Sequence, residues 1–131
     1  MIRALIAPRR YVQGAGALSE ASALVGALGN RILLAMGPNV REALGERLTG
    51  ALESSGADVV PFMFSGESSR AQVSAGVEVA RREGATVIVG AGGGKTVDTA
   101  RAIAANLGAA MVSLPTIASN DSPTSAVTVY Y

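Results

Sequence analysis

The sequence predicts an α/β fold in which a doubly wound, mostly parallel sheet is covered by helices on both faces. Short apolar runs of strand length alternate with longer segments of helical spacing, and the connections between them are only a few residues long. Hydrophobic residues make up 49% of the chain but aromatic residues only 4%, so Ala, Val, Leu and Ile must build the core. Such a core is typical of sheets buried on both faces. Repeated strand–helix units connect by right-handed crossovers, so the strands are expected to run parallel.

The predicted elements follow one another as alternating helices and strands, and local signals mark several of their ends. Ser19 and Ser69 are candidate N-terminal helix caps. Gly29, Gly56, Gly84 and Gly108 each follow a helical segment, where a C-terminal cap is expected. The expected strands are 31–36, 58–64, 86–89 and 110–114, and the expected helices are 18–28, 40–54, 70–82 and 96–107.

After residue 114 a polar run follows, and residues 126–131 alternate like another strand at the end of the sequence. Because a natural domain rarely ends inside an element, we expect the chain to be part of a longer protein.

The composition excludes several classes of function. With no histidine and no cysteine, the chain cannot form a disulfide, a thiolate nucleophile or a Ser-His-Asp triad, and it offers a metal only oxygen ligands. The formal net charge is +1, and the paired arginines lack interleaved aromatics, so no nucleic-acid partner is expected. No segment approaches the ~18 apolar residues of a membrane span, and the N-terminus lacks a signal peptide, so a cytoplasmic protein without a membrane partner is expected.

The most informative segment is Val87-Ile-Val-Gly-Ala-Gly-Gly-Gly-Lys-Thr96. A buried strand leads into glycines and a lysine, and a helix follows near Thr96. Glycines let the backbone approach a ligand closely, and the start of a helix favours anions. Lys95 adds a positive charge. The segment therefore predicts a phosphate or diphosphate site, the alternative being a flexible turn without a ligand.

Two common nucleotide motifs do not fit this segment. A Walker A loop requires glycine at position 89, which is Val89, and the G-x-G-x-x-G fingerprint requires glycine at position 95, which is Lys95. Asp98 follows in the first turns of the expected helix. It is expected to have a structural role, because an acid near a helix start is favourable whatever the function.

A polar segment follows the last expected parallel strand, from Leu114 to Ser125. It carries the hydroxyl side chains of Thr116, Ser119, Ser122, Thr124 and Ser125 and the carboxylate of Asp121. Leaving the carboxyl end of a strand, it is expected to flank the same crevice as the glycines, where hydroxyls can bind ribose, phosphate or amide groups. The alternative is an ordinary Ser/Pro-rich surface loop.

In two motifs the sequence resembles the glycerol dehydrogenases of the iron-containing alcohol dehydrogenase superfamily. The motifs are Gly92-Gly-Gly-Lys-Thr-Val-Asp-Thr-Ala100 and Pro115-Thr-Ile-Ala-Ser-Asn-Asp-Ser-Pro-Thr-Ser125. The same pattern is fitted by Tyr11-Val-Gln-Gly14 with Gly16, and by the segment from Pro61 through Phe64-Ser-Gly-Glu67. The resemblance covers the whole chain and implies that residues 1–131 form one Rossmann-like, dinucleotide-binding domain of the dehydroquinate synthase-like type.

The resemblance implies an oxidoreductase that transfers a hydride from a secondary hydroxyl of glycerol, or of a related vicinal diol, to NAD. It also implies a homo-oligomer, and a helical C-terminal domain, absent from this chain, that binds zinc or iron through its own ligands. The resemblance also implies roles for residues of this chain. Gly93, Gly94 and Lys95 would bind the diphosphate, and Thr116 and Ser119 would contact the cofactor. The nicotinamide would be surrounded by Ser125, Val127 and Tyr131, and Asp121 would have a catalytic position beside the diol.

One position departs from the resemblance. In the family that the sequence resembles, NAD-preferring enzymes usually carry an acid after the first strand, where this sequence has Gly37. An acid would repel the 2′-phosphate of NADP, whereas glycine leaves room for it, so we hypothesise that NADP is also used, with Asn39 or Arg41 as a contact.

Three other interpretations remain open at this stage. They are a glycerol-1-phosphate dehydrogenase, a dehydroquinate synthase-like lyase with the same fold, and a stand-alone nucleotide-binding module without redox activity. The Thr-Ile-Ala-Ser-Asn-Asp segment favours an unphosphorylated substrate.

Overall fold

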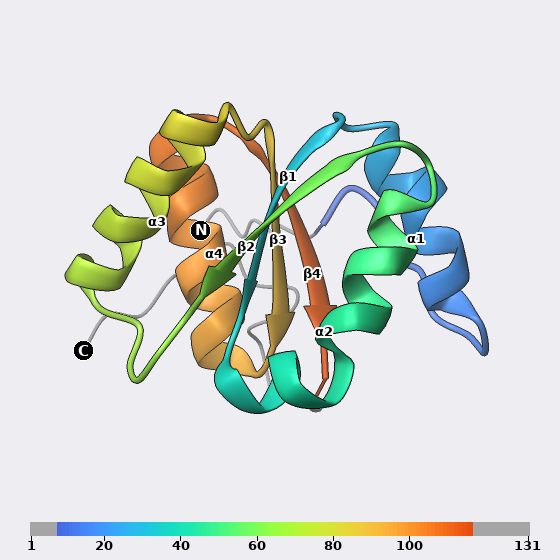
Figure 1. Cartoon of the computed structure of the whole chain (residues 1–131), viewed down its shortest axis with the longest axis horizontal. Coiled ribbons are helices and arrows are strands. Elements are labelled where there is room, and N and C mark those ends of the chain that lie inside the picture. Colours follow the sequence, from blue (N-terminus) through green and yellow to red (C-terminus); the bar gives the residue numbers. More distant parts are fainter. Residues whose placement is uncertain (1–7, 117–131) are drawn as a thin grey trace, which may run out of the picture.

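The chain folds into a four-stranded parallel sheet with helices on both faces (Figure 1). The computed structural model describes residues 8–116. Neighbouring strands follow the order β2-β1-β3-β4, and all three pairs run parallel. In chain order the elements are α1 (Ala17–Gly26), β1 (Arg31–Met36), α2 (Pro38–Glu53), β2 (Asp58–Met63), α3 (Arg70–Glu83), β3 (Val87–Gly92), α4 (Gly94–Leu107) and β4 (Ala110–Pro115).

The sheet separates two helical layers, which confirms the predicted doubly wound fold. Figure 1 shows α1 and α2 on one side of the sheet and α3 and α4 on the other. Alternate residues of the central strands supply the two cores: Leu33 and Ile88 pack toward α3 and α4, and Ile32 and Val89 pack toward α1 and α2. All four of these side chains are fully buried. Aliphatic side chains thus build the cores, as the composition predicted.

The helix ends agree with the sequence signals at some positions and differ at others. Ser69 caps α3 by accepting a hydrogen bond from the backbone N–H of Gln72, and Gly84 and Gly108 end α3 and α4 in the left-handed conformation. The prediction for Ser19 is wrong, because α1 begins after Gly16 and Ser19 lies inside the helix. Helices α1 and α2 end at Gly26 and Glu53, with Ala27 and Ser54 as C-caps, so the predicted glycine caps at positions 29 and 56 lie beyond the helix ends.

The third strand extends further than its sequence predicted. It continues to Gly92, because pairing with strands on both sides places Gly90 between Ala35 and Ser113. A Cβ atom at Gly90 would lie only 2.6 Å from the Cβ of Ala100, so the glycine lets α4 pack directly on β3. Of the four glycines between residues 90 and 94, Gly90 and Gly92 therefore belong to the strand and not to a loop.

Candidate functional site

The candidate site lies at the carboxyl ends of the central strands. In the sheet, β2 lies on one side of β1, and β3 and β4 lie on the other side of β1. The order of the strands therefore reverses between β1 and β3. In parallel α/β sheets a crevice forms where the order reverses, because the connections that follow the two neighbouring strands leave toward opposite faces of the sheet. In Figure 1 the arrowheads end at the lower edge of the sheet, where α2 and α4 begin.

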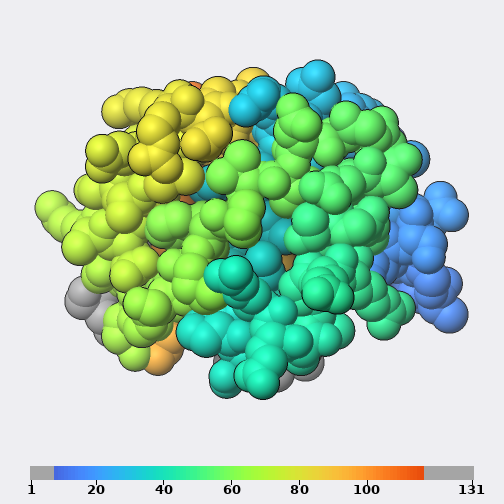
Figure 2. Space-filling view, viewed as in Figure 1, coloured from blue at the N-terminus to red at the C-terminus, as the bar shows by residue number. Residues whose placement is uncertain are grey.

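A pocket of about 390 Å³ occupies this edge. Its walls come from three segments: the start of α2, the connection between β2 and α3, and the start of α4. In Figure 2 the surfaces of these segments, teal, yellow-green and orange, meet along the lower edge of the molecule. The lining residues are Gly37, Pro38, Phe64, Gly66, Gly93, Gly94, Lys95 and Thr96.

Two helices start at this pocket with glycine as the N-terminal cap. Gly37 caps α2 and Gly93 caps α4, and neither helix start has a side-chain cap hydrogen bond. The start of an α-helix carries a partial positive charge and backbone N–H groups without intrahelical acceptors. Because glycine has no side chain, a ligand can approach the backbone closely at both starts. The pocket is therefore suited to a phosphate or diphosphate group.

Lys95 lies in the first turn of α4 and forms an ion pair with Glu67, its Nζ donating a hydrogen bond to Oε1 of Glu67. Both side chains are about half exposed, at 55% for Lys95 and 52% for Glu67. Glu67 belongs to the connection between β2 and α3. The pair thus joins two of the three segments that line the pocket.

The structure brings together the predicted diphosphate-binding residues Gly93, Gly94 and Lys95, all of which line the pocket. Thr116 lies at the same edge of the sheet, where its backbone N–H donates a 3.1 Å hydrogen bond to the carbonyl of Gly92, but it is not part of the pocket lining. The other predicted residues, Ser119, Asp121, Ser125, Val127 and Tyr131, lie outside the described residues, as does the expected strand 126–131.

Gly37 lines the pocket at the start of α2. The nearest atom to a Cβ built there is the carbonyl oxygen of Phe64, at 4.0 Å, so the space beside Gly37 is open. Asn39 and Arg41, the hypothesised contacts for a 2′-phosphate, are exposed and are not part of the pocket lining.

Asp98 lies beyond the first turn of α4, because the helix begins at Gly94 and not near Thr96, so the predicted interaction with the helix start is wrong. Its carboxylate forms a 2.6 Å ion pair with Arg101 one turn further along α4, and both side chains are largely buried, at 16% and 13% exposure.

Sequence reasoning gave no role to Glu67, Phe64, Gly66 or Pro38. Glu67 belongs to a segment that the resemblance already included, and it follows a strand whose carboxyl end reaches the same edge as the glycines. That position was a signal for a site residue, because carboxyl ends of parallel strands share one edge. Its pairing with Lys95, 28 residues away, depends on the tertiary fold.

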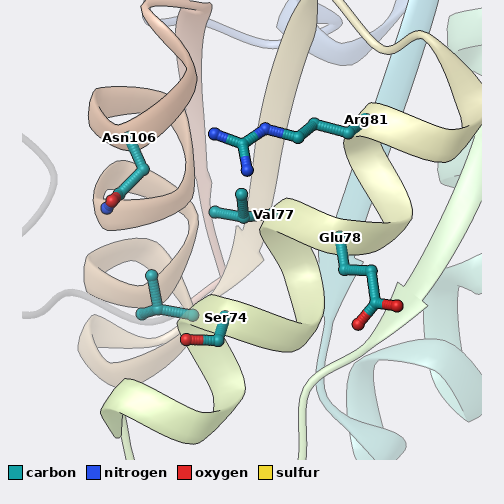
Figure 3. A pocket seen from close by; sticks show the side chains of 6 residues that line it. Ser74, Val77, Glu78, Arg81 and Asn106 are labelled. Atoms are coloured by element: carbon teal, nitrogen blue, oxygen red, sulfur yellow. The ribbon is translucent and has the colours of Figure 1, made fainter.

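A second hollow, of about 360 Å³, lies on the outer side of α3 and α4. Figure 3 shows the side chain of Arg81 extending toward Asn106 across it. Arg81 lies in the last turn of α3, and Asn106 lies at the end of α4, where its amide donates to the carbonyl of Ala102. Helix C-termini carry a partial negative charge. The hollow extends along the side of α3 from Val73 to Arg81, and no helix N-cap lines it, unlike the first pocket.

Residues 8–116 contain no cluster of three His, Cys, Asp or Glu side chains that could hold a metal ion. None of the helices in this range combines the length and apolar character needed to cross a membrane.

Comparison with known proteins gives consistent matches over the chain. The family model for iron-containing alcohol dehydrogenase matches residues 8–131. A glycolaldehyde reductase of Halobacterium salinarum is 40% identical over 95% of this chain and 34% of its own length. A glycerol dehydrogenase of Pseudomonas putida is 36% identical over 100% of this chain and 36% of its own length. The crystal structure of a probable glycerol dehydrogenase from Sinorhizobium meliloti 1021 superposes with a TM-score of 0.87, at 37% identity over 99% of this chain and 35% of that chain. The chain thus spans about a third of the length of these relatives.

Proposed function

The chain belongs to the iron-containing alcohol dehydrogenase family, and from this membership we propose that it is the dinucleotide-binding part of a nicotinamide-dependent polyol dehydrogenase. The proposed reaction transfers a hydride from a secondary hydroxyl of glycerol, or of a related vicinal diol, to NAD. The glycerol dehydrogenases among the relatives support this substrate class. Because the chain spans 34 to 36% of the lengths of the curated relatives described above, the activity is proposed for a longer protein that contains it.

The observation that carries the proposal is the pocket between the starts of α2 and α4. Two helix starts direct their partial positive charges toward it, and Lys95 adds a full charge at its rim. A diphosphate is the group that uses all three charges at once, because it carries two negative charges on adjacent phosphates. Gly93 and Gly94 would hold one phosphate through backbone N–H groups, as glycine-rich helix starts do.

The remaining roles are proposed from the resemblance. Thr116 and Ser119 would contact the cofactor, Ser125, Val127 and Tyr131 would surround the nicotinamide, and Asp121 would lie beside the diol. When bound, the nicotinamide supplies the acceptor for the hydride. Residues 8–116 hold no cluster of three potential metal ligands. From the resemblance, the ligands of zinc or iron would lie in a helical C-terminal domain of the longer protein.

NADP use is part of the proposal. The open space beside Gly37 supports it, because a group larger than a hydroxyl meets no side chain there. Asn39 and Arg41 are exposed and do not line the pocket, so neither residue supports a contact with the 2′-phosphate. We therefore attribute the proposed use of NADP to the absence of an acid at position 37 and not to an attractive contact with the 2′-phosphate.

Binding of ADP and NAD to the Lys95→Met variant tests the proposal. Hydrogen bonds to charged groups contribute about 1.5–3 kcal/mol, so the variant should bind both ligands at least about tenfold more weakly in calorimetry. Arg81→Met is the matched control, because it removes a cation beside the second hollow. Equal dissociation constants for the wild type and Lys95→Met would refute the diphosphate site.

A substrate panel separates the candidate reactions. The family-length protein would be assayed with glycerol, glycolaldehyde and glycerol-1-phosphate in the presence of nicotinamide cofactor. Glycolaldehyde is included because a relative with 40% identity is a glycolaldehyde reductase. Faster turnover of glycerol-1-phosphate would favour the phosphorylated-substrate alternative. Dinucleotide binding without turnover of any of these compounds would favour a binding module without redox activity.

A further inference from the structure

In the proposed function the positive charge of Lys95 binds the diphosphate. In this structure the same charge is already paired with Glu67. Lys95 is the only lysine in the chain, and in this structure its ammonium group already donates to a carboxylate. An ammonium paired with a carboxylate presents a smaller net charge to an incoming diphosphate. The contact therefore bears directly on how tightly the pocket can bind an anion.

Glu67 is presented by a segment that is anchored on both sides. Before it, Phe64 is 5% exposed, and its N–H donates a 2.9 Å hydrogen bond to the carbonyl of Met36 at the end of β1. After it, Ser68 is 1% exposed and Ser69 caps α3. The carboxylate is thus held beside the start of α4 by buried neighbours, although the side chain itself is half exposed.

We propose that Glu67 is an affinity-setting counter-charge, which a bound diphosphate displaces from Lys95. This inference rests on the proposed function. A diphosphate at the α4 start carries two negative charges and also uses the helix field, so it outcompetes a single carboxylate for the lysine. Glu67 then faces the ligand as a like charge, which opposes binding.

The expected size of the effect follows from the exposure of the pair. Exposed ion pairs are weak, and breaking one changes an equilibrium constant by up to about fivefold. Removal of the Glu67 charge also removes its repulsion of the diphosphate. Both contributions have the same sign, so neutralising Glu67 should tighten ligand binding by about two- to fivefold.

The test compares Glu67→Gln with Glu83→Gln. Glu83 is the matched control, because it is a partly exposed carboxylate in ion pairs with Arg82 and Arg31, and it lies at the far end of α3 from the pocket. Both substitutions raise the net charge by one unit. In calorimetry with ADP as the probe, Glu67→Gln should lower the dissociation constant two- to fivefold, whereas Glu83→Gln should leave it unchanged.

Two further measurements make the result decisive. Thermal unfolding without ligand should show that Glu67→Gln is no more stable than the wild type, since a general stabilisation would also tighten binding. Glu67→Ala is the second variant if Glu67→Gln fails to fold. Unchanged or weaker ADP binding in the folded variant would overturn the inference, because Glu67 would then support the ligand or be irrelevant to it.

Lys95→Met measured in parallel separates this inference from the proposed function. If Lys95→Met weakens binding and Glu67→Gln does not tighten it, the diphosphate site stands and only the counter-charge role fails. If Lys95→Met has no effect on ADP binding, both fail, whatever Glu67→Gln does, because the lysine is then not a ligand of the diphosphate.

Discussion

The starts of α2 and α4 share a backbone arrangement but differ in what surrounds it. Each follows a buried central strand, begins with a glycine cap and lines the same pocket. At α4 the helix is pressed onto its strand through Gly90, and Lys95 adds a charge. At α2 the space beside Gly37 is open, and α2 contributes no charged side chain to the pocket lining. The two helix starts thus share one backbone arrangement but differ in the charge and the space that their surroundings offer a ligand.

The largest expected effect tests the close packing on the α4 side. A Cβ at Gly90 would lie 2.6 Å from the Cβ of Ala100, which is fixed to the backbone of α4 and cannot rotate away. Gly90→Val should therefore lower the free energy of unfolding by about 3 kcal/mol, the upper range for overpacking a core. Urea denaturation monitored by circular dichroism measures this change.

Gly37→Ala is the control for that substitution on the α2 side. Its new methyl group would meet only the carbonyl oxygen of Phe64, at 4.0 Å, so the free energy of unfolding should fall only by the difference between a glycine and an alanine N-cap, about 0.7 kcal/mol. Similar losses at positions 90 and 37 would show that the two helix starts are equally constrained, and the comparison would then be wrong.

The next effect concerns cofactor choice at the α2 side. Gly37→Asp introduces an acid where the space is open, so the carboxylate should repel a 2′-phosphate and accept hydrogen bonds from ribose hydroxyls. The ratio of NADP affinity to NAD affinity should fall about tenfold, which corresponds to one charge interaction of about 1.4 kcal/mol. Calorimetric titration with both cofactors measures the ratio.

Gly37→Asn separates charge from size in that experiment. Asparagine has nearly the same shape as aspartate but no charge, so most of the tenfold change should be absent. If the asparagine variant discriminates against NADP as strongly as the aspartate variant does, lost space and not repulsion determines the choice.

The pattern of apolar residues was sufficient to predict the fold, because short apolar runs of strand length alternate with longer segments of helical spacing. Connections of a few residues separate these segments. The expected strand 31–36 coincides with β1, and Ser69, Gly84 and Gly108 were correctly identified as helix caps. Ser19 was misassigned, because its side chain is a suitable cap but the helix already starts after Gly16. Local preference alone cannot distinguish neighbouring cap positions when the flanking segment also accepts a helix.

The site could be predicted only as far as it is continuous in the sequence. The glycines and Lys95 are neighbours, and the rule for strand ends placed them correctly. The extension of β3 to Gly92 depends on pairing with β1 and β4, which is tertiary information. Likewise, the pairing of Lys95 with Glu67 depends on side-chain positions from two separate segments.

The smallest effect asks whether a glycine cap weakens a helix, and α3 supplies the reference because Ser69 caps it with a 3.3 Å side-chain hydrogen bond. Ser69→Ala should lower the free energy of unfolding by about 1 kcal/mol, whereas Ser69→Gly should cost only a few tenths of that, about 0.3 kcal/mol. The difference arises because glycine adopts the cap conformation readily and leaves the first N–H groups accessible to solvent. A small cost for glycine means that α2 and α4 can keep their first turns open to a ligand with little loss of helix stability. If chemical denaturation shows equal losses for both variants, the glycine caps at the pocket must be stabilised by something other than their own backbone freedom.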